Sequence, residues 1–226
     1  MQTENIPDES PAALLFPQFE SDLYLMIASE VEGLSAEQLD FESAEWGWSE
    51  WSIRRNLSHM ASGDIRWFWQ RWGRQLFPDG LPSGLPSPEE LDGLLESKYD
   101  RRFDEDLYWD VDVLLEKLRM GLALAQAILS NETAGSLRTK ESERIDDGQW
   151  PWFYAAHPTG LRRDSQDQTR AWLTLEVTFR HRYFEHITHL YNIQRIKRVQ
   201  GLTTKVKIPI EGYLALPGWD LSEPPE

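Results

Sequence analysis

The chain contains no cysteine among its 226 residues. Disulfide bonds and a thiolate nucleophile are therefore excluded. Residues 1–10 are polar and acidic, which argues against a secretory signal, and no apolar run approaches the length of a membrane span. These absences together are compatible with a soluble cytoplasmic protein that has no membrane partner, and this is what we expect.

Positive charge is also scarce. The chain has 23 Lys and Arg residues against 38 Asp and Glu residues, and its formal net charge is −15. The one dense basic cluster, residues 195–198, is short, and we expect it to be the solvated end of a helix, where cations interact favourably with the helix dipole. The charge balance therefore argues against a nucleic-acid partner.

Several familiar catalytic motifs are missing. The glycines at positions 33, 47, 63 and 73 are isolated, so no glycine-rich phosphate loop is present. The sequence also has no nucleophile elbow and no His-Glu-x-x-His pair. Any chemistry must therefore come from a less regular set of residues.

Apolar residues are plentiful, at 40% of the chain, and aromatic residues make up 12%. This is enough for one packed core, and the length fits one domain with an insertion better than two domains. We expect a single helical domain over residues 1–226, with its core at about 12–200 and a C-terminal extension at 201–226.

Apolar residues recur at helical spacing in four long segments. Ser52 and Ser87 stand where the N-cap of a helix is expected, and prolines and glycines make residues 77–88 a loop or arm. The pattern predicts long helices at about 12–33, 52–76, 110–130 and 165–199, short helical segments at 34–39 and 88–99, and an extended segment or short strand at 203–216.

The first candidate site residue is His59, in a stretch from Glu45 to Trp72 that holds six of the eleven tryptophans. On a helix that begins after Ser52, His59 lies close to the apolar side and should point inward. A buried histidine needs a polar partner.

The second candidate group lies on the last helix. Taking His186 as the reference on its buried stripe, Arg182 and His189 lie about 40° and 60° to one side and Glu185 lies about 100° round on the same side. His181 lies about 140° away, and we expect it to stay outside a site centred on His186. His157 and His181 are most simply surface or loop residues.

Two segments resemble the DinB-like family of four-helix bundles. Residues 51–55, Trp-Ser-Ile-Arg-Arg, lead to His59 at the spacing of the family's second helix, although Arg55 replaces the usual acid. Residues 186–190, His-Ile-Thr-His-Leu, are similar to the end of the family's fourth helix, although Arg182 stands where the first histidine of a pair is usual.

The resemblance implies a mainly α fold: an up-down-down-up four-helix bundle, here with an inserted arm between the second and third helices and a C-terminal extension. It also implies a three-histidine metal site, chemistry related to thiol-dependent S-transferases, and a homodimer, since family members often dimerise.

Two interpretations of the candidate site stay open. Zinc or nickel could be bound by His59, His186 and His189, with Glu185 as a possible carboxylate ligand. Alternatively, Arg182 repels a dication and pairs with Glu185, which leaves a metal-free polar network.

Two functions follow from these interpretations. The first is an enzyme in which a divalent metal activates a low-molecular-weight thiol or a water molecule for attack on a small electrophile. The second is a non-catalytic small-ligand-binding or stress-related protein with a degenerate metal site, whose cleft is lined by Trp51, Arg55 and Arg182.

Overall fold

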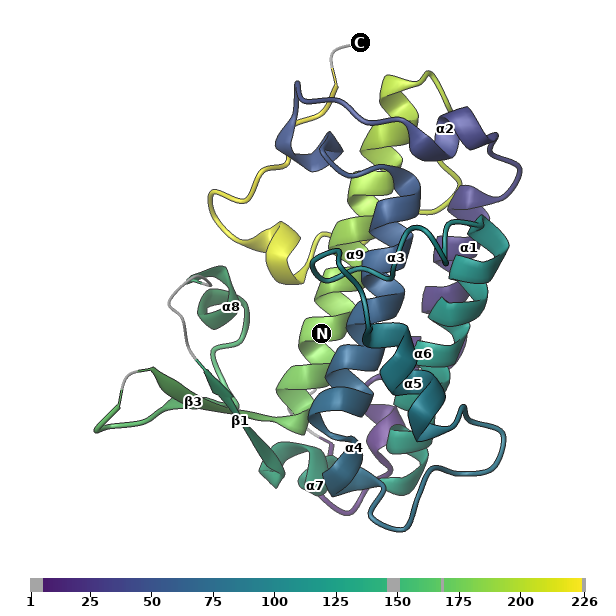
Figure 1. The fold of residues 1–226 in the computed structure, drawn as a ribbon. Coiled ribbons are helices and arrows are strands. Elements are labelled where there is room, and N and C mark those ends of the chain that lie inside the picture. Colours follow the sequence, from purple (N-terminus) through teal and green to yellow (C-terminus); the bar gives the residue numbers. More distant parts are fainter. Residues whose placement is uncertain (1–5, 146–150, 168, 225–226) are drawn as a thin grey trace.

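A computed structural model of the protein describes residues 6–145, 151–167 and 169–224. It is mainly helical and carries a small three-stranded sheet at one side (Figure 1), which confirms the predicted mainly α class. Helix α3 (Ile53–Asp64) packs against α6 (Val111–Asn131) and α9 (Leu175–Val199), and α1 (Asp22–Val31) also contacts both α6 and α9. The side chains between these helices form one apolar core.

Shorter elements surround this core. The shorter helices are α2 (Ala36–Asp40), α4 (Gly73–Leu76), α5 (Pro88–Leu95), α7 (Ala134–Thr139) and α8 (Pro151–Ala156). Single 3₁₀ turns cover Ala12–Leu14, Pro17–Phe19, Gly47–Ser49 and Gly212–Ala215.

The helix starts predicted after Ser52 and Ser87 are confirmed by their caps. The Ser52 hydroxyl accepts a hydrogen bond from the Arg55 backbone N–H at 3.3 Å, and Ser87 accepts from Glu90 at 3.2 Å. At α2, Ser35 and Gln38 satisfy each other's backbone N–H groups in a reciprocal capping box. These caps determine where α2, α3 and α5 begin.

The segment predicted as one helix from 52 to 76 is continuous but not uniform. After α3, residues Ile65–Arg71 form a π-helical segment (η4), and α4 follows. A π-helix closes i→i+5 hydrogen bonds and is wider than an α-helix, so side chains four or five positions apart share a face. Periodicity at 3.6 residues did not indicate this change.

The first helix is shorter than predicted. The segment 12–21 forms two 3₁₀ turns around Pro17, and α1 begins only at Asp22. Pro17 has no backbone N–H and lies at the start of the second turn, so one uninterrupted helix from residue 12 is not formed.

The last helix was also predicted too long at its start. It begins at Leu175, capped by Thr174, because residues 170–174 form a strand instead. The sheet order is β1 (Glu141–Ile145), β3 (Arg170–Thr174), β2 (Leu161–Arg163), and both pairings are antiparallel. Glu141 pairs with Thr174 and Leu161 with Leu173, so the sheet leads directly into α9.

The C-terminal extension lies over α9 without forming a strand. Trp219 stacks on Tyr213 with ring centroids 5.4 Å apart, and Ser222 accepts a hydrogen bond from Trp48 Nε1 at 3.2 Å. The buried carboxylate of Glu30 accepts from the backbone N–H groups of Lys205 and Val206, at 2.7 and 2.8 Å. These contacts tie the extension to the helical core.

The basic cluster at 195–198 is not the solvated helix end that we expected. Arg195 and Lys197 are each only 2% exposed. Lys197 pairs with the buried carboxylate of Glu30, and Arg195 donates to the backbone oxygens of Asp220 and Ser222 at 3.1 and 3.0 Å. These two cations hold α1 and the C-terminal extension against α9.

A search of the described helices for a membrane span found none that is both long and apolar enough.

Candidate metal centre

Three side chains from two helices converge at the centre of the molecule. His59 comes from α3, and Glu185 and His189 lie one turn apart on α9. Glu185 Oε2 lies 3.3 Å from His59 Nε2 and 3.6 Å from His189 Nε2. All three atoms lie within 4.8 Å of one another.

The outer nitrogen of His59 faces a backbone carbonyl. His59 Nδ1 lies 3.1 Å from the Arg101 carbonyl oxygen, which can only accept a hydrogen bond. Nδ1 therefore carries the proton, and in the neutral ring Nε2 presents a lone pair to Glu185. Burial, followed by the charge of His189, lowers the pKa of His59 to about 4, so the ring is neutral at pH 7.

Arg101 reaches this position through an unusual backbone conformation. Its φ of 56° lies in the left-handed region, which is uncommon for a residue with a side chain. The same carbonyl also accepts from the Ser62 hydroxyl at 3.3 Å. Such conformations persist where the surrounding structure fixes them, and here the result is an acceptor aimed at His59.

The outer nitrogen of His189 faces the side-chain amide of Asn56. Asn56 Nδ2 donates to the carbonyl oxygens of Trp51 and Ser52 at 3.0 and 2.9 Å, which determines the orientation of the amide. Its Oδ1 must then be the atom 2.7 Å from His189 Nδ1. His189 therefore donates from Nδ1, and its Nε2 is the ring atom that faces Glu185.

Two ring nitrogens and one carboxylate oxygen thus meet in one buried space. Burial raises the pKa of Glu185, but its contacts with His189 and His59 outweigh this and hold the pKa well below its ordinary range. One proton between these atoms can satisfy only one of the two contacts to Glu185. A metal ion would satisfy all three atoms at once.

Trp51, which was predicted to line a ligand cleft, lies against the two imidazoles of this group. Its ring stacks on His189 with centroids 6.1 Å apart and lies 5.1 Å from the His59 ring. The guanidinium of Arg102 also lies over the indole ring of Trp51, 4.9 Å from its centroid. Trp51 therefore shields the two imidazoles from solvent.

His186 belongs to a separate cluster. Its Nε2 lies 2.9 Å from Asp64 Oδ2, and Arg182 Nε donates to Asp64 Oδ1 at 2.9 Å. The predicted set with His186 as a ligand beside His59 is therefore not what the geometry brings together. Arg182 pairs with Asp64 and not with Glu185, so its charge is already neutralised beside the metal candidate.

Two glycines make room for this buried cluster. A Cβ on Gly63 would lie 2.6 Å from Arg182 Nη2, and one on Gly121 would lie 2.6 Å from Asp64 Cβ. Arg182 also donates to the Met60 carbonyl at 3.0 Å. The guanidinium is thus held flat against the backbone of α3.

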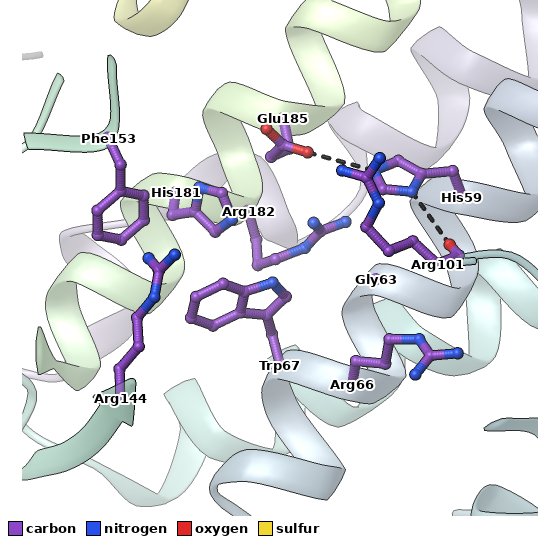
Figure 2. Close-up of a pocket in the computed structure, with 10 residues that line it drawn as sticks. All are labelled: His59, Gly63, Arg66, Trp67, Arg101, Arg144, Phe153, His181, Arg182 and Glu185. Carbon is purple, nitrogen blue, oxygen red and sulfur yellow. Dashed lines mark hydrogen bonds and ion pairs between the residues drawn. The ribbon is translucent and has the colours of Figure 1, made fainter. Parts of the chain in front are cut away.

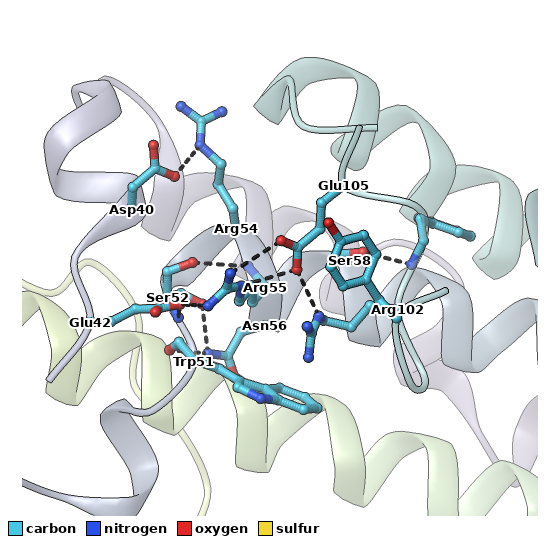
Figure 3. A network of polar contacts seen from close by, with 12 residues as sticks. Asp40, Glu42, Trp51, Ser52, Arg54, Arg55, Asn56, Ser58, Arg102 and Glu105 are labelled. Carbon is cyan, nitrogen blue, oxygen red and sulfur yellow. Dashed lines mark hydrogen bonds and ion pairs between the residues drawn. The ribbon is translucent and has the colours of Figure 1, made fainter. Parts of the chain in front are cut away.

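Arg55 does not line the cavity next to the metal candidate. Figure 3 shows it between Glu42 and Glu105, at 2.5 and 3.0 Å, in a network that joins the start of α3 to the loop after α5. Its predicted role in a ligand cleft therefore has no geometric support. The neighbouring Arg54 pairs with Asp40 at 2.6 Å.

A cavity of about 140 Å³ adjoins the group His59, Glu185 and His189. Figure 2 shows Trp67 in the middle of its wall, with Phe153 and His181 on one side and Arg66 on the other. His59 and Glu185 form the inner end. The full lining is His59, Gly63, Arg66, Trp67, Arg101, Arg144, Phe153, His181, Arg182 and Glu185.

His157 and His181 are both buried, so neither lies at the surface; His157 is in the loop after α8, as expected, whereas His181 lies on α9. His181 Nδ1 lies 2.7 Å and His157 Nε2 lies 3.2 Å from the hydroxyl of Tyr213. Burial lowers the pKa of His157 to about 3 and that of His181 well below its ordinary range. Tyr213, from the C-terminal extension, thus closes the outer side of the cavity wall.

Sequence reasoning missed Asp64 and Asn56. Both are polar residues in the same helical segment as His59, Asn56 three positions before it and Asp64 five after it, and both are almost fully buried. Their residue type and their spacing from His59 could have marked them as candidate site residues. What the sequence does not show is that each one orients a histidine of α9.

No family model, no curated protein and no solved structure matches this chain.

Proposed function

We propose that His59, Glu185 and His189 bind a divalent metal ion, zinc or nickel, and that the protein is a metal-dependent enzyme acting on small electrophiles. One observation carries this proposal: three ligand atoms converge while the far nitrogen of each imidazole donates to a fixed oxygen. Metal-binding histidines are ordinarily oriented by such outer hydrogen bonds.

The spacing of the ligand atoms fits an ion. Two ligands about 2.1 Å from a tetrahedral zinc ion lie about 3.4 Å apart. The separations of 3.3 and 3.6 Å from Glu185 to the two histidines are close to this value. Two histidines and one carboxylate leave a coordination position, as in known catalytic zinc sites.

A bound ion of this kind lowers the pKa of a coordinated water or thiol and so supplies a nucleophile at neutral pH. The chain's own residues prepare the site in three ways. Arg101 and Asn56 fix the ring orientations, Asp64 neutralises Arg182, and Trp51 excludes water. The cavity gives a small substrate, or a low-molecular-weight thiol, access to the inner end.

The DinB-like resemblance is part of this proposal. In that interpretation α1, α3, α6 and α9 are the four helices of the bundle, and the segment with α5 is the inserted arm. The contacts of α3 and α1 with α6 and α9 support this arrangement. The metal site would differ from the family's usual three histidines, because it would be formed by His59, Glu185 and His189.

Catalytic activity should depend on the bound metal ion. We expect zinc- or nickel-loaded protein to hydrolyse activated esters or to transfer a thiol to an electrophilic acceptor, and Glu185→Gln to lose at least about a hundredfold in rate, since an amide is a poor ligand for these ions. Glu176→Gln, in the first turn of the same helix, where the carboxylate pairs with Arg180 and Arg138 and not with the site, is the matched control and should keep full activity.

A second candidate is a small-molecule-binding protein without catalysis. The observation in its favour is the cavity wall, which offers ring surfaces and guanidinium groups that bind ligands without reacting. Metal-loaded protein that binds ligands and converts none of the test electrophiles would select this candidate and contradict the enzyme.

A further inference from the structure

Three arginines beside the cavity lack a carboxylate partner. Arg66 Nε donates to the Ser62 hydroxyl at 3.1 Å, Arg71 donates to the backbone oxygen of Glu143 at 3.2 Å, and the Arg144 guanidinium lies 4.7 Å from the centre of the Phe153 ring. Within the part of the chain that the structure describes, none of the three forms an ion pair. This contrasts with an acidic chain of net charge −15, in which carboxylates are abundant.

The arginines are held together in spite of their like charges. Burial, followed by the charge of Arg144, lowers the pKa of Arg71 to about 10. Two uncompensated cations this close disfavour the folded state unless an anion joins them. The neighbouring Arg170 and Arg162, by comparison, pair with Glu143 and Glu141.

The π-helical segment η4 places Arg66 and Arg71 on one face. Arg66, Trp67, Gln70 and Arg71 line a groove of about 450 Å³, together with Ser142 and Glu143 of β1. Arg66 and Trp67 also line the cavity next to Glu185, so the groove and the cavity adjoin at these two residues. The Arg71 guanidinium lies 4.4 Å from the centre of the Trp67 ring.

The wall between the two ends is aromatic. Trp67 and Phe153 lie nearly parallel, with ring centroids 6.4 Å apart, and His181 lies 4.5 Å from Trp67. A ligand would therefore meet ring surface between Arg144 and the inner end, where His59 and Glu185 lie (Figure 2). The cavity volume of about 140 Å³ limits this inner part to roughly the size of one benzene ring.

We propose that the cavity and groove bind a small organic anion, whose carboxylate or phosphate group contacts Arg71 and Arg144 while its apolar part lies against Trp67. The proposal deepens the proposed function and rests on it only for the direction of the ligand, whose reacting end points toward His59, Glu185 and His189. Guanidinium groups bind carboxylate and phosphate oxygens with charge-assisted hydrogen bonds.

Calorimetric titration with four probes tests this: benzoate, phenyl phosphate, inorganic phosphate and the neutral analogue benzamide. We expect benzoate or phenyl phosphate to bind, with affinity that falls as salt is added, and benzamide to bind at least about tenfold more weakly. The ratio of benzoate to phenyl phosphate identifies the preferred anionic group, and phosphate alone shows how much the ring contributes.

Variants localise the anion. Arg71→Gln and Arg144→Gln should each weaken binding about tenfold, while Arg74→Gln, on the exposed side of α4, should leave it unchanged. Circular dichroism checks that each variant is folded. Equal binding of benzamide and benzoate, no binding of any anion at millimolar concentration, or an equal loss in the Arg74 control would overturn the proposal.

The titrations are repeated on chelator-treated protein and on Glu185→Gln. Anion binding that survives without metal supports the arginine site even where the metal proposal fails. Metal binding without anion binding contradicts the arginine site alone.

Discussion

At the scale of single residues, the most consequential side chain outside the metal candidate is Asp64. It is fully buried and lies against two groups of α9, Arg182 and His186. Burial raises the pKa of Asp64, but the charges of His186 and Arg182 outweigh this and lower it. Asp64 is thus the counter-charge that allows Arg182 to lie beside a metal site.

Replacing Asp64 with Asn should therefore destabilise the protein strongly. The change leaves a buried guanidinium without its carboxylate, which typically costs about 3–5 kcal/mol. Asp106→Asn, in an exposed pair with Lys98, is the control and should cost less than about 1 kcal/mol. Urea denaturation measures both, and equal losses would contradict the buried role of Asp64.

The sequence made several of these residues predictable and others not. His59, Glu185 and His189 follow from helix periodicity and the pairing of residues four apart on one helix. Their separation from His186 does not follow, because it depends on where α3 places Asp64 against α9. The partner of Arg182 was equally hidden, since Glu185 is its neighbour in sequence and Asp64 is 118 positions away.

At the scale of elements, α3 and α6 approach each other closely beside Asp64, and this close approach keeps Asp64 buried. Gly121 on α6 lies where a Cβ would be 2.6 Å from Asp64 Cβ and 3.5 Å from the Ala61 carbonyl oxygen. The first contact is to an atom fixed by the backbone, so it cannot be relieved by a rotamer change. A side chain at this position must push the helices apart.

Gly121→Ala should accordingly destabilise the protein by about 1–3 kcal/mol, as overpacking of a core does. Gly93→Ala provides the contrast, because a Cβ there meets no atom within 4 Å in the exposed face of α5. That change should be neutral or stabilise the helix by up to about 1 kcal/mol. Thermal unfolding of both variants gives the comparison, and a stabilised Gly121 variant would show that α3 and α6 are not tightly packed.

Element boundaries were predictable where a side-chain cap determines them. Ser35, Ser52 and Ser87 begin helices as their side chains require. The start of α9 was not predictable from helix periodicity, because residues 170–174 have their pairing partners in β1 and β2, which lie elsewhere in the sequence. The π-helical segment η4 was not predictable for a similar reason, because contacts with other elements fix its side chains.

At the scale of the whole molecule, the helical core and the C-terminal extension together enclose the site. α3 and α9 supply the ligands, β1 supplies Arg144, and the extension supplies Tyr213, which lies against His181. The extension is held by the buried pair of Glu30 and Lys197 and by Arg195. The expectation of a homodimer stays a prediction at this scale.

The most direct test of the account is the metal content of tag-free protein, measured by plasma mass spectrometry beside Glu185→Gln and the control Glu176→Gln. We predict close to one zinc or nickel ion per chain in the wild type and in the control, and almost none in Glu185→Gln. The absence of metal from all three proteins after incubation with excess divalent ions, with the fold intact, would contradict the account, because His59, Glu185 and His189 would then be a polar cluster only.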